Sequence, residues 1–295
     1  MKKETKSYME FYKDYGFFLK EGIVTSTDQY EKEEIAKLLR FECSSLPAGE
    51  TYSIPEYCGK MKAGQREIFY LSAPSRQLAE NSPYFESLKK AETEVLFCYE
   101  PYDELVLMQL QQFDKKTVTS VEKEMRSGPS EETVVTDDTL ELKDQTDLTD
   151  WVKVTLGPKA AKIKTTSKLE SHPCVVTVEE MAAARHFIKT QGANFSEEQR
   201  FTILQPQFEL NPAHPIIKKL NGLKESNPKL AILVTEQLFA NAMVSRFLMM
   251  VMEYSCSFTL LIMTTLTQVS AGLVEDPRTM LKSMNDLLQQ ALEKH

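Results

Sequence analysis

The chain has 295 residues, 42% of them hydrophobic, and carries a formal net charge of −8 at pH 7. A chain of this length is expected to form about two domains, each with its own core. The acidic balance argues against nucleic-acid binding, which needs clustered lysines and arginines.

The five cysteines are far apart and form no CxxC or His/Cys cluster, so we expect reduced, intracellular thiols and no zinc site. No cleavable targeting segment is expected before the fold, because the first residues lead straight into an amphipathic helical pattern. Its apolar stripe holds Tyr8, Phe11, Tyr12, Tyr15, Phe18 and Leu19.

Two further helices are indicated by capping residues. Asp28 can cap one helix, and Ser53 with Glu56 can form a capping box for the next. Residues 1–60 are therefore predicted to be helical.

Residues 61–124 alternate between the two periodicities. Apolar runs of strand length occupy 68–71, 95–99 and 118–121, and helical stretches occupy 83–91 and 103–113. This order predicts an α/β unit with a small parallel sheet and right-handed crossovers.

The stretch from 124 to 150 has nine acidic and two basic residues, with Ser-Gly-Pro at 127–129, and is interpreted as an acidic linker over 125–150.

Residues 151–295 predict an α+β domain that ends in helices. A short helix near Trp151 comes first, followed by strands at 161–166, 175–178 and 201–210 and a helix over 179–191. Three Asn-Pro or Asp-Pro pairs, beginning at 211, 227 and 276, each predict a capped helix start. The last helix carries one continuous apolar stripe, which needs a partner.

No motif for catalysis, a cofactor or a metal stands out. Residues 59–66 have the glycine spacing of a phosphate loop but lack its lysine. Cys174 and His186 could form a thiol nucleophile only if folding joined them, and a buried cysteine with an ordinary histidine is the simpler interpretation. His172, His214 and His295 have no metal-like spacing.

Two apolar segments leave alternatives open. In the helix at 179–188, Met181 beside Phe187 suggests an adaptable contact surface, although these side chains could equally pack on neighbouring strands. Residues 247–269 have the length of a membrane span, but polar side chains are scattered through them, so composition does not separate a span from a buried segment.

Several strings together resemble the middle and C-terminal domains of the heat-shock protein 90 chaperones. They are Tyr57-Cys58-Gly59-Lys60-Met61, Glu94-Val95-Leu96-Phe97, Phe113-Asp114-Lys115-Lys116 and residues 209–217, and the resemblance runs in order over nearly the whole chain. Residues 72–76, 181–187, 272–277 and 292–295 are similar to the mitochondrial type of the family, which implies a mitochondrial location.

The resemblance implies a homodimeric, ATP-dependent chaperone that binds unfolded or partly folded client proteins. ATP, Mg and the catalytic arginine would belong to a front part that precedes this chain, so no catalytic or cofactor-binding residue is assigned here. It also implies a small three-layer αβα middle subdomain at 61–124, preceded by a helical segment at 1–60, and a dimerisation domain at 151–295. The implied client-binding residues are Met181, His186, Phe187 and Ile188; the implied dimerisation residues are Leu238, Phe239, Leu281, Met284, Leu287, Leu288, Ala291 and Leu292.

The chain departs from the family at 246–270, which looks like an insertion between two helices of the dimer bundle. A retained intron or a mispredicted gene model is favoured over a real apolar variant, and a membrane span is the least favoured. If the insertion separates the bundle helices, it should weaken pairing. Two rival functions remain: an adaptor that pairs with the full-length chaperone and blocks its cycle, and a membrane-attached product that uses 247–269.

Overall fold

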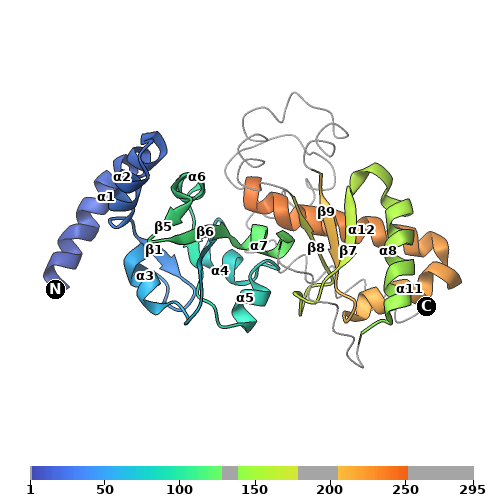
Figure 1. Cartoon of the computed structure of the whole chain (residues 1–295). Helices are drawn as coiled ribbons and strands as arrows, with labels where there is room; N and C mark the ends of the chain where they lie inside the picture. The colour runs from blue at the N-terminus through green and yellow to red at the C-terminus, as the bar shows by residue number, and fades with distance from the viewer. Residues whose placement is uncertain (1, 128–138, 179–204, 252–295) are drawn as a thin grey trace, which may run out of the picture. The chain divides into compact units, whose positions relative to one another are not determined.

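The computed structural model, drawn in Figure 1, describes residues 2–127, 139–178 and 205–251. The chain divides into two compact units. Unit 1 consists of Met1–Glu80 and Leu88–Val121, and unit 2 consists of Asn81–Ser87 and the chain from Glu122 onward.

Unit 1 begins with the predicted helices. Helix α1 spans Lys2–Thr25, α2 spans Gln29–Ala36 and α3 spans Ile54–Lys60. The predicted caps are confirmed: Asp28 accepts a hydrogen bond from the backbone N–H of Tyr30, and Ser53 and Glu56 form the capping box of α3. These side chains satisfy N–H groups that have no partner inside a helix.

The sheet of unit 1 has six strands in the order β2-β1-β4-β3-β6-β5. The parallel arrangement predicted for its three central strands is confirmed, since β3 (Glu67–Ser72) pairs in parallel with both β4 (Leu96–Cys98) and β6 (Lys116–Ser120). The strands β1 (Phe41–Cys43), β2 (Thr51–Tyr52) and β5 (Gln112–Phe113) join the sheet in antiparallel pairs.

The prediction that residues 1–60 are helical throughout is wrong, because β1 and β2 lie within them. Each strand is too short for a repeat of two residues to be detected. The turn between them has a physical signature, since Gly49 has a φ of +84°, a left-handed conformation that favours glycine.

The helices that follow β3 differ from the helical stretches predicted at 83–91 and 103–113. Helix α4 spans Arg76–Glu80, α5 spans Glu86–Lys90, at the boundary of the two units, and α6 spans Pro101–Leu110. Helix α6 ends at Leu110, and the φ of +58° at the following Gln111 turns the chain into β5, so the predicted helix over 103–113 extends three residues too far.

The core of unit 1 lies between α6 and one face of the sheet, with α1 and α2 packed beside α6. Four consecutive residues of β3, from Ile68 to Leu71, are buried, which means that both faces of this strand are covered. Tyr57 of α3 is fully buried, and its hydroxyl donates to the Glu94 carbonyl at 2.6 Å and accepts from the Phe69 N–H at 3.2 Å.

Unit 2 is built on a sheet with the order β7-β9-β8. Strand β7 (Lys162–Thr165) is parallel to β9 (Gln207–Leu210), and β8 (Cys174–Thr177) is antiparallel to it. Strands β7 and β9 fall inside their predicted runs, and β8 begins and ends one residue before its predicted run of 175–178. The described part of unit 2 also contains helix α8 (Leu142–Leu156), a short 3-10 turn at Gly157–Lys159, and the helices α11 (Pro215–Ser226) and α12 (Pro228–Val251).

The acidic linker predicted for 125–150 is in part helical. Helix α7 covers Val121–Ser127, α8 begins at Leu142, and residues 128–138 lie outside the described residues. Leu148, Val152 and Leu156 of α8 recur every four residues on its buried face. The acidic residues that suggested a loop are, within α8, the solvent-facing residues of an amphipathic helix.

The three predicted Asn-Pro and Asp-Pro helix starts have different outcomes. Asn227 does cap α12, accepting from the Leu230 N–H at 3.3 Å, whereas the pair at 276 lies outside the described residues. Helix α11 begins after His214, not after Asn211. Buried Asn211 instead donates to the carbonyls of Leu169 and His172, both at 3.2 Å, and thereby holds the loop before β8.

A buried ion pair joins α1 to the first turn of α6. The Lys20 Nζ lies 2.6 Å from Asp103 Oδ1 and 2.7 Å from Glu100 Oε2, and the side chains of Lys20 and Asp103 are almost completely buried. Burial alone would lower the pKa of Lys20, but the Asp103 and Glu100 carboxylates raise it above its usual value. Lys20 is therefore held as a cation inside the unit.

We expect Lys20→Met to destabilise the chain by about 3 kcal/mol, because it leaves the buried Asp103 carboxylate without a counter-charge. Urea denaturation followed by far-ultraviolet circular dichroism measures this loss. Lys37→Met is the matched control, since Lys37 pairs with Glu34 at the surface, and it should leave the midpoint unchanged. Equal midpoints for both variants would contradict the importance of the buried pair.

Candidate protein-binding surfaces

Helix α12 carries the two predicted dimerisation residues that the structure describes. The side chains of Leu238 and Phe239 are only 1% and 5% exposed. The Phe239 ring contacts Phe208 of β9 edge to face, with 5.3 Å between centroids, and the Cys174 thiol of β8 faces the Leu238 carbonyl at 3.7 Å. Both side chains thus belong to the core of their own unit.

This burial changes the role that Leu238 and Phe239 can have in pairing. Neither offers side-chain surface to another chain, so they would support α12 rather than contact a partner. Among the described side chains of α12, the large apolar ones that are exposed are Ile232 and Leu233. The remaining predicted dimerisation residues, 281–292, lie outside the described residues, as do most of 246–270; α12 itself continues to Val251.

Among the described helices, none has the length and apolar character needed to cross a membrane.

The predicted client-binding residues Met181, His186, Phe187 and Ile188 also lie outside the described residues. The structure does describe the strand that leads to them. Strand β8 ends at Thr177, and Val178 after it is buried. The attachment point of the predicted client-facing helix is therefore a strand packed on both faces.

A buried polar cluster lies on the face of this sheet that points away from the unit 2 core. Glu209 of β9 is completely buried, and its Oε1 accepts hydrogen bonds from the Gln207 amide at 2.8 Å and the Thr177 hydroxyl at 3.2 Å. The Lys164 Nζ of β7 lies 3.4 Å from the same oxygen. The cluster connects all three strands.

The electrostatics of this cluster do not fully balance. Burial raises the pKa of Glu209, and Lys164 with the two hydrogen bonds lowers it only in part. All three contacts go to Oε1, and Oε2 is a buried oxygen without a hydrogen-bond partner in the described structure. Glu209 therefore favours the protonated form more than an ordinary glutamate does.

The structure argues against the thiol nucleophile considered from the sequence. Cys174 is buried against α12, and burial raises the pKa of its thiol, so a reactive thiolate is disfavoured. His186 lies outside the described residues.

The other two described histidines have structural roles in unit 2. The His172 Nδ1 lies 2.7 Å from Glu86 Oε1, and the His214 Nδ1 accepts from the Ile216 N–H at the start of α11. Within the described ranges no group of three metal-ligating side chains occurs.

The glycine pair at 59 and 64 does not have the context of a phosphate loop. Gly59 lies in the last turn of α3 and Gly64 in the connection to β3, so the pair spans a helix-to-strand connection, whereas a phosphate loop joins a strand to a helix. Nothing in its geometry points to a nucleotide.

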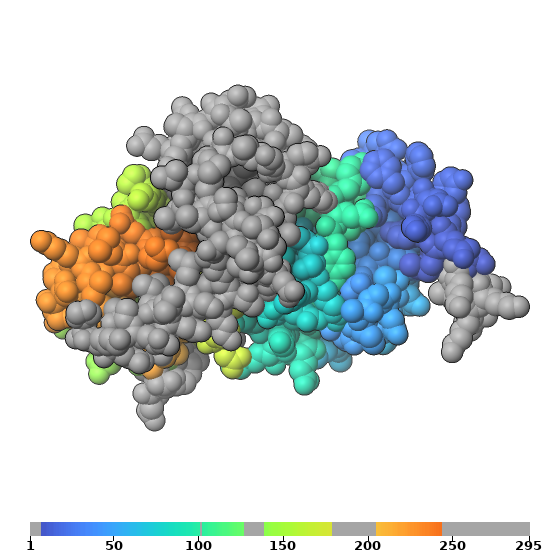
Figure 2. Space-filling model, turned by 180° about the vertical axis from the view of Figure 1, so that it is seen from behind, coloured from blue at the N-terminus to red at the C-terminus, as the bar shows by residue number. Residues whose placement is uncertain are grey.

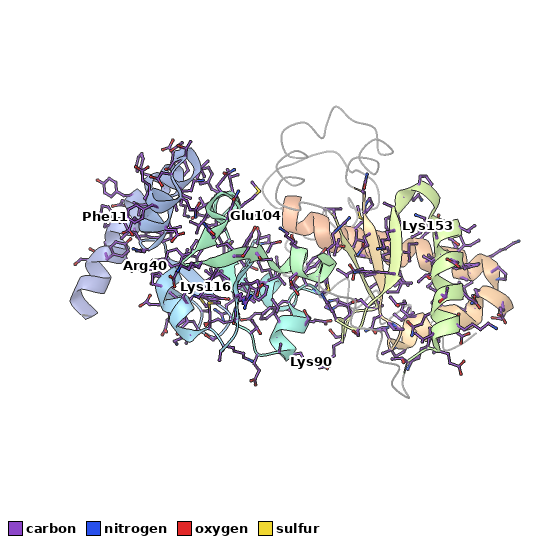
Figure 3. The ribbon with its side chains drawn as sticks, in the orientation of Figure 1. Phe11, Arg40, Lys90, Glu104, Lys116 and Lys153 are labelled. Carbon is purple, nitrogen blue, oxygen red and sulfur yellow. The ribbon has the colours of Figure 1, made fainter. Side chains whose placement is uncertain are left out.

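The outer face of α1 is a surface that the sequence alone did not identify. Phe11, Tyr15 and Phe18 are 47%, 52% and 62% exposed, and Figure 3 shows the Phe11 side chain projecting outward from the helix. Tyr12 and Leu19 pack against the core of unit 1. The apolar stripe predicted for α1 is therefore divided between a buried row and an exposed row.

The signal for this division is present in the spacing. Residues 12, 16, 19 and 23 recur every three or four positions and form the inner row, and 11, 15 and 18 form a second row one residue earlier. Two adjacent apolar rows form a strip that is wider than the surface one packed neighbour can cover. Large exposed apolar patches mark interaction surfaces.

Glu209→Gln is expected to alter the pH dependence of stability. A carboxyl whose pKa is raised by folding stabilises the fold below its unfolded pKa and loses this contribution as the pH rises through the folded value. The wild-type chain should therefore lose stability relative to Glu209→Gln as the pH rises above the ordinary glutamate pKa of 4.5. Urea midpoints measured by the fluorescence of Trp151, the single tryptophan, report on unit 2.

Glu236→Gln is the control for this change, because Glu236 forms only a surface pair with Lys159. Its stability relative to wild type should stay constant over the same pH range. A constant difference for Glu209→Gln as well would contradict the raised pKa of Glu209.

Comparison with known proteins gives the family. The family model described as Hsp90 protein matches residues 1–291. The chain is similar to heat shock protein 75 kDa, mitochondrial, of Rattus norvegicus, with 44% identity over 100% of this chain and 39% of that protein. It is also 32% identical to the mitochondrial TNF receptor-associated protein 1 homolog of Dictyostelium discoideum, over 99% of this chain and 37% of that protein. The chaperone protein HtpG of Desulfitobacterium hafniense is 29% identical over 99% of this chain.

The chain spans about two-fifths of the length of the curated relatives it matches, 39% for the rat protein. The family match covers nearly all of its residues, across both structural units. The chain therefore belongs to the Hsp90 family.

Proposed function

We propose that this chain is the client-holding and self-associating part of an ATP-dependent molecular chaperone. The observation that carries the proposal is the match of the Hsp90 family model to residues 1–291. Nucleotide binding and hydrolysis would belong to the length of the relatives that this chain does not span. A mitochondrial location is proposed from the names of the rat and Dictyostelium relatives.

Client holding is proposed for two surfaces of different kinds. One is the predicted helix that follows β8, with Met181, His186, Phe187 and Ile188. The other is the exposed aromatic face of α1. Exposed apolar side chains on a folded scaffold suit an unfolded client, which offers apolar residues that it has not buried.

Self-association is proposed for the terminal helix rather than for α12. The apolar stripe of residues 280–292 recurs at helical spacing, which supports burial against another helix. Leu238 and Phe239 would contribute by fixing α12 to its own sheet, as their burial suggests.

The chain should suppress aggregation of a heat-unfolded reporter enzyme without nucleotide, measured by light scattering over a range of chain-to-reporter ratios. Met181→Ser with Phe187→Ser should weaken suppression severalfold, because both remove apolar contact area. Val154→Ser is the matched control, since Val154 is 84% exposed on α8 and belongs to neither surface. If the wild-type chain suppresses aggregation at none of these ratios, the proposed function is refuted.

Sedimentation over a concentration series should show a dimer. Met284→Asp with Leu288→Asp should weaken self-association at least tenfold, because a charge buried in an apolar interface is left unpaired. Val154→Asp should have no effect. Removal of residues 246–270 should strengthen self-association if this segment separates the pairing helices. Unchanged dimer affinity in the double aspartate variant would exclude the terminal helix as the contact.

A further inference from the structure

The outer face of α1 carries two rows of side chains that run side by side. Phe11, Tyr15 and Phe18 form the aromatic row, and Glu10, Asp14 and Glu21 form the acidic row. All six residues are exposed. Since successive helical residues are rotated by about 100°, positions 10, 14 and 21 lie directly beside positions 11, 15 and 18.

The aromatic row is a continuous strip. The rings of Phe11 and Tyr15 are stacked with 5.0 Å between their centroids, and Tyr15 and Phe18 are 6.4 Å apart. Tyr8 extends the strip at 6.1 Å from Phe11, and its hydroxyl donates to the Leu38 carbonyl. In Figure 2 the blue atoms of α1 and α2 lie at the surface.

Across the described residues, the carboxylates of Glu10, Asp14 and Glu21 take part in no ion pair. Lys20, on the same helix, is already committed to Asp103 inside the unit. Lys13 lies three residues after Glu10 and about 60° around the helix from it, next to the acidic row, but no ion pair joins the two in the described structure.

These observations define the chemistry of the missing partner. An apolar strip beside a row of carboxylates complements a helix that has an apolar face and a flank of lysine or arginine. From Tyr8 to Phe18 the strip is straight and about 15 Å long, and its rings lie about one turn apart, which matches side chains at helical spacing better than those of an extended chain. A second copy of α1 would bring another acidic row against the first.

We propose that the outer face of α1, defined by the aromatic row and the acidic row, binds a basic amphipathic helix of a client protein. The inference rests on the proposed client-holding function and names the class of client segment that this face would select. The aromatic row supplies apolar contact area, and the acidic row fixes the orientation of the bound helix through its basic flank.

The test is fluorescence anisotropy of three labelled 18-residue peptides with the purified full chain. The first is a basic amphipathic helix of leucine and lysine, the second replaces lysine by glutamate, and the third scrambles the first. The basic amphipathic peptide should bind, more weakly as salt increases, and the other two at least tenfold less tightly.

Two variants separate the contributions of the rows. Phe11→Ser with Phe18→Ser should weaken binding of the basic peptide at least tenfold. Glu10→Gln with Asp14→Asn and Glu21→Gln should weaken it about tenfold and flatten its salt dependence. Circular dichroism verifies that both remain folded; because the charge variant changes only exposed carboxylates, it keeps the test valid if the serine variant unfolds.

Matched controls come from unit 2. Ile232→Ser with Leu233→Ser removes exposed apolar side chains from α12, and Asp147→Asn with Asp150→Asn and Glu225→Gln removes three exposed charges. Neither should change binding of the basic peptide.

The outcomes distinguish this inference from the proposed function. If the wild-type chain suppresses reporter aggregation but binds the basic peptide no better than the α1 charge variant does, the α1 inference is wrong and client holding stands. Equal binding of the basic and acidic peptides would also overturn it. If the chain neither suppresses aggregation nor binds any peptide, both proposals fail.

Discussion

Helix α1 can turn only one side toward its own unit, and this constraint decides which of its side chains remain available to other molecules. Tyr12, Leu19 and Ile23 occupy the inner side and pack on the core that α6 shares with the sheet. Lys20 fixes the rotation of the helix, because its ammonium group must reach the Asp103 carboxylate. With this rotation set, the row that begins at Phe11 has nowhere to pack within the unit.

Much of the fold could be predicted from local patterns. The caps at Asp28 and Ser53 and the parallel pairing of β3 with β4 and β6 follow from residue chemistry within a few positions. The antiparallel strands β1 and β2 could not be found in this way, because strands this short are stabilised by their neighbours in the sheet and not by their own periodicity. Asn211 shows a related limit: a residue that suits a helix cap can instead hold a loop, and only the fold decides which carbonyls it meets.

The pairing residues show what periodicity leaves open for a candidate site. Apolar side chains at helical spacing favour burial, but the spacing does not say whether the same chain or another one buries them. Leu238 and Phe239 are buried by their own chain, since β8 and β9 supply the complementary surface. The family resemblance could not distinguish these cases, because a residue that supports an interface and a residue that forms it occupy the same helix.

The edges of the six-stranded sheet have a consequence for the proposed client-holding function. The two edge strands, β2 and β5, are each only two residues long. A longer edge would offer a row of unpaired N–H and C=O groups to which an unfolded polypeptide could hydrogen-bond as a further strand. With edges this short, unit 1 offers an approaching chain almost no template for strand addition.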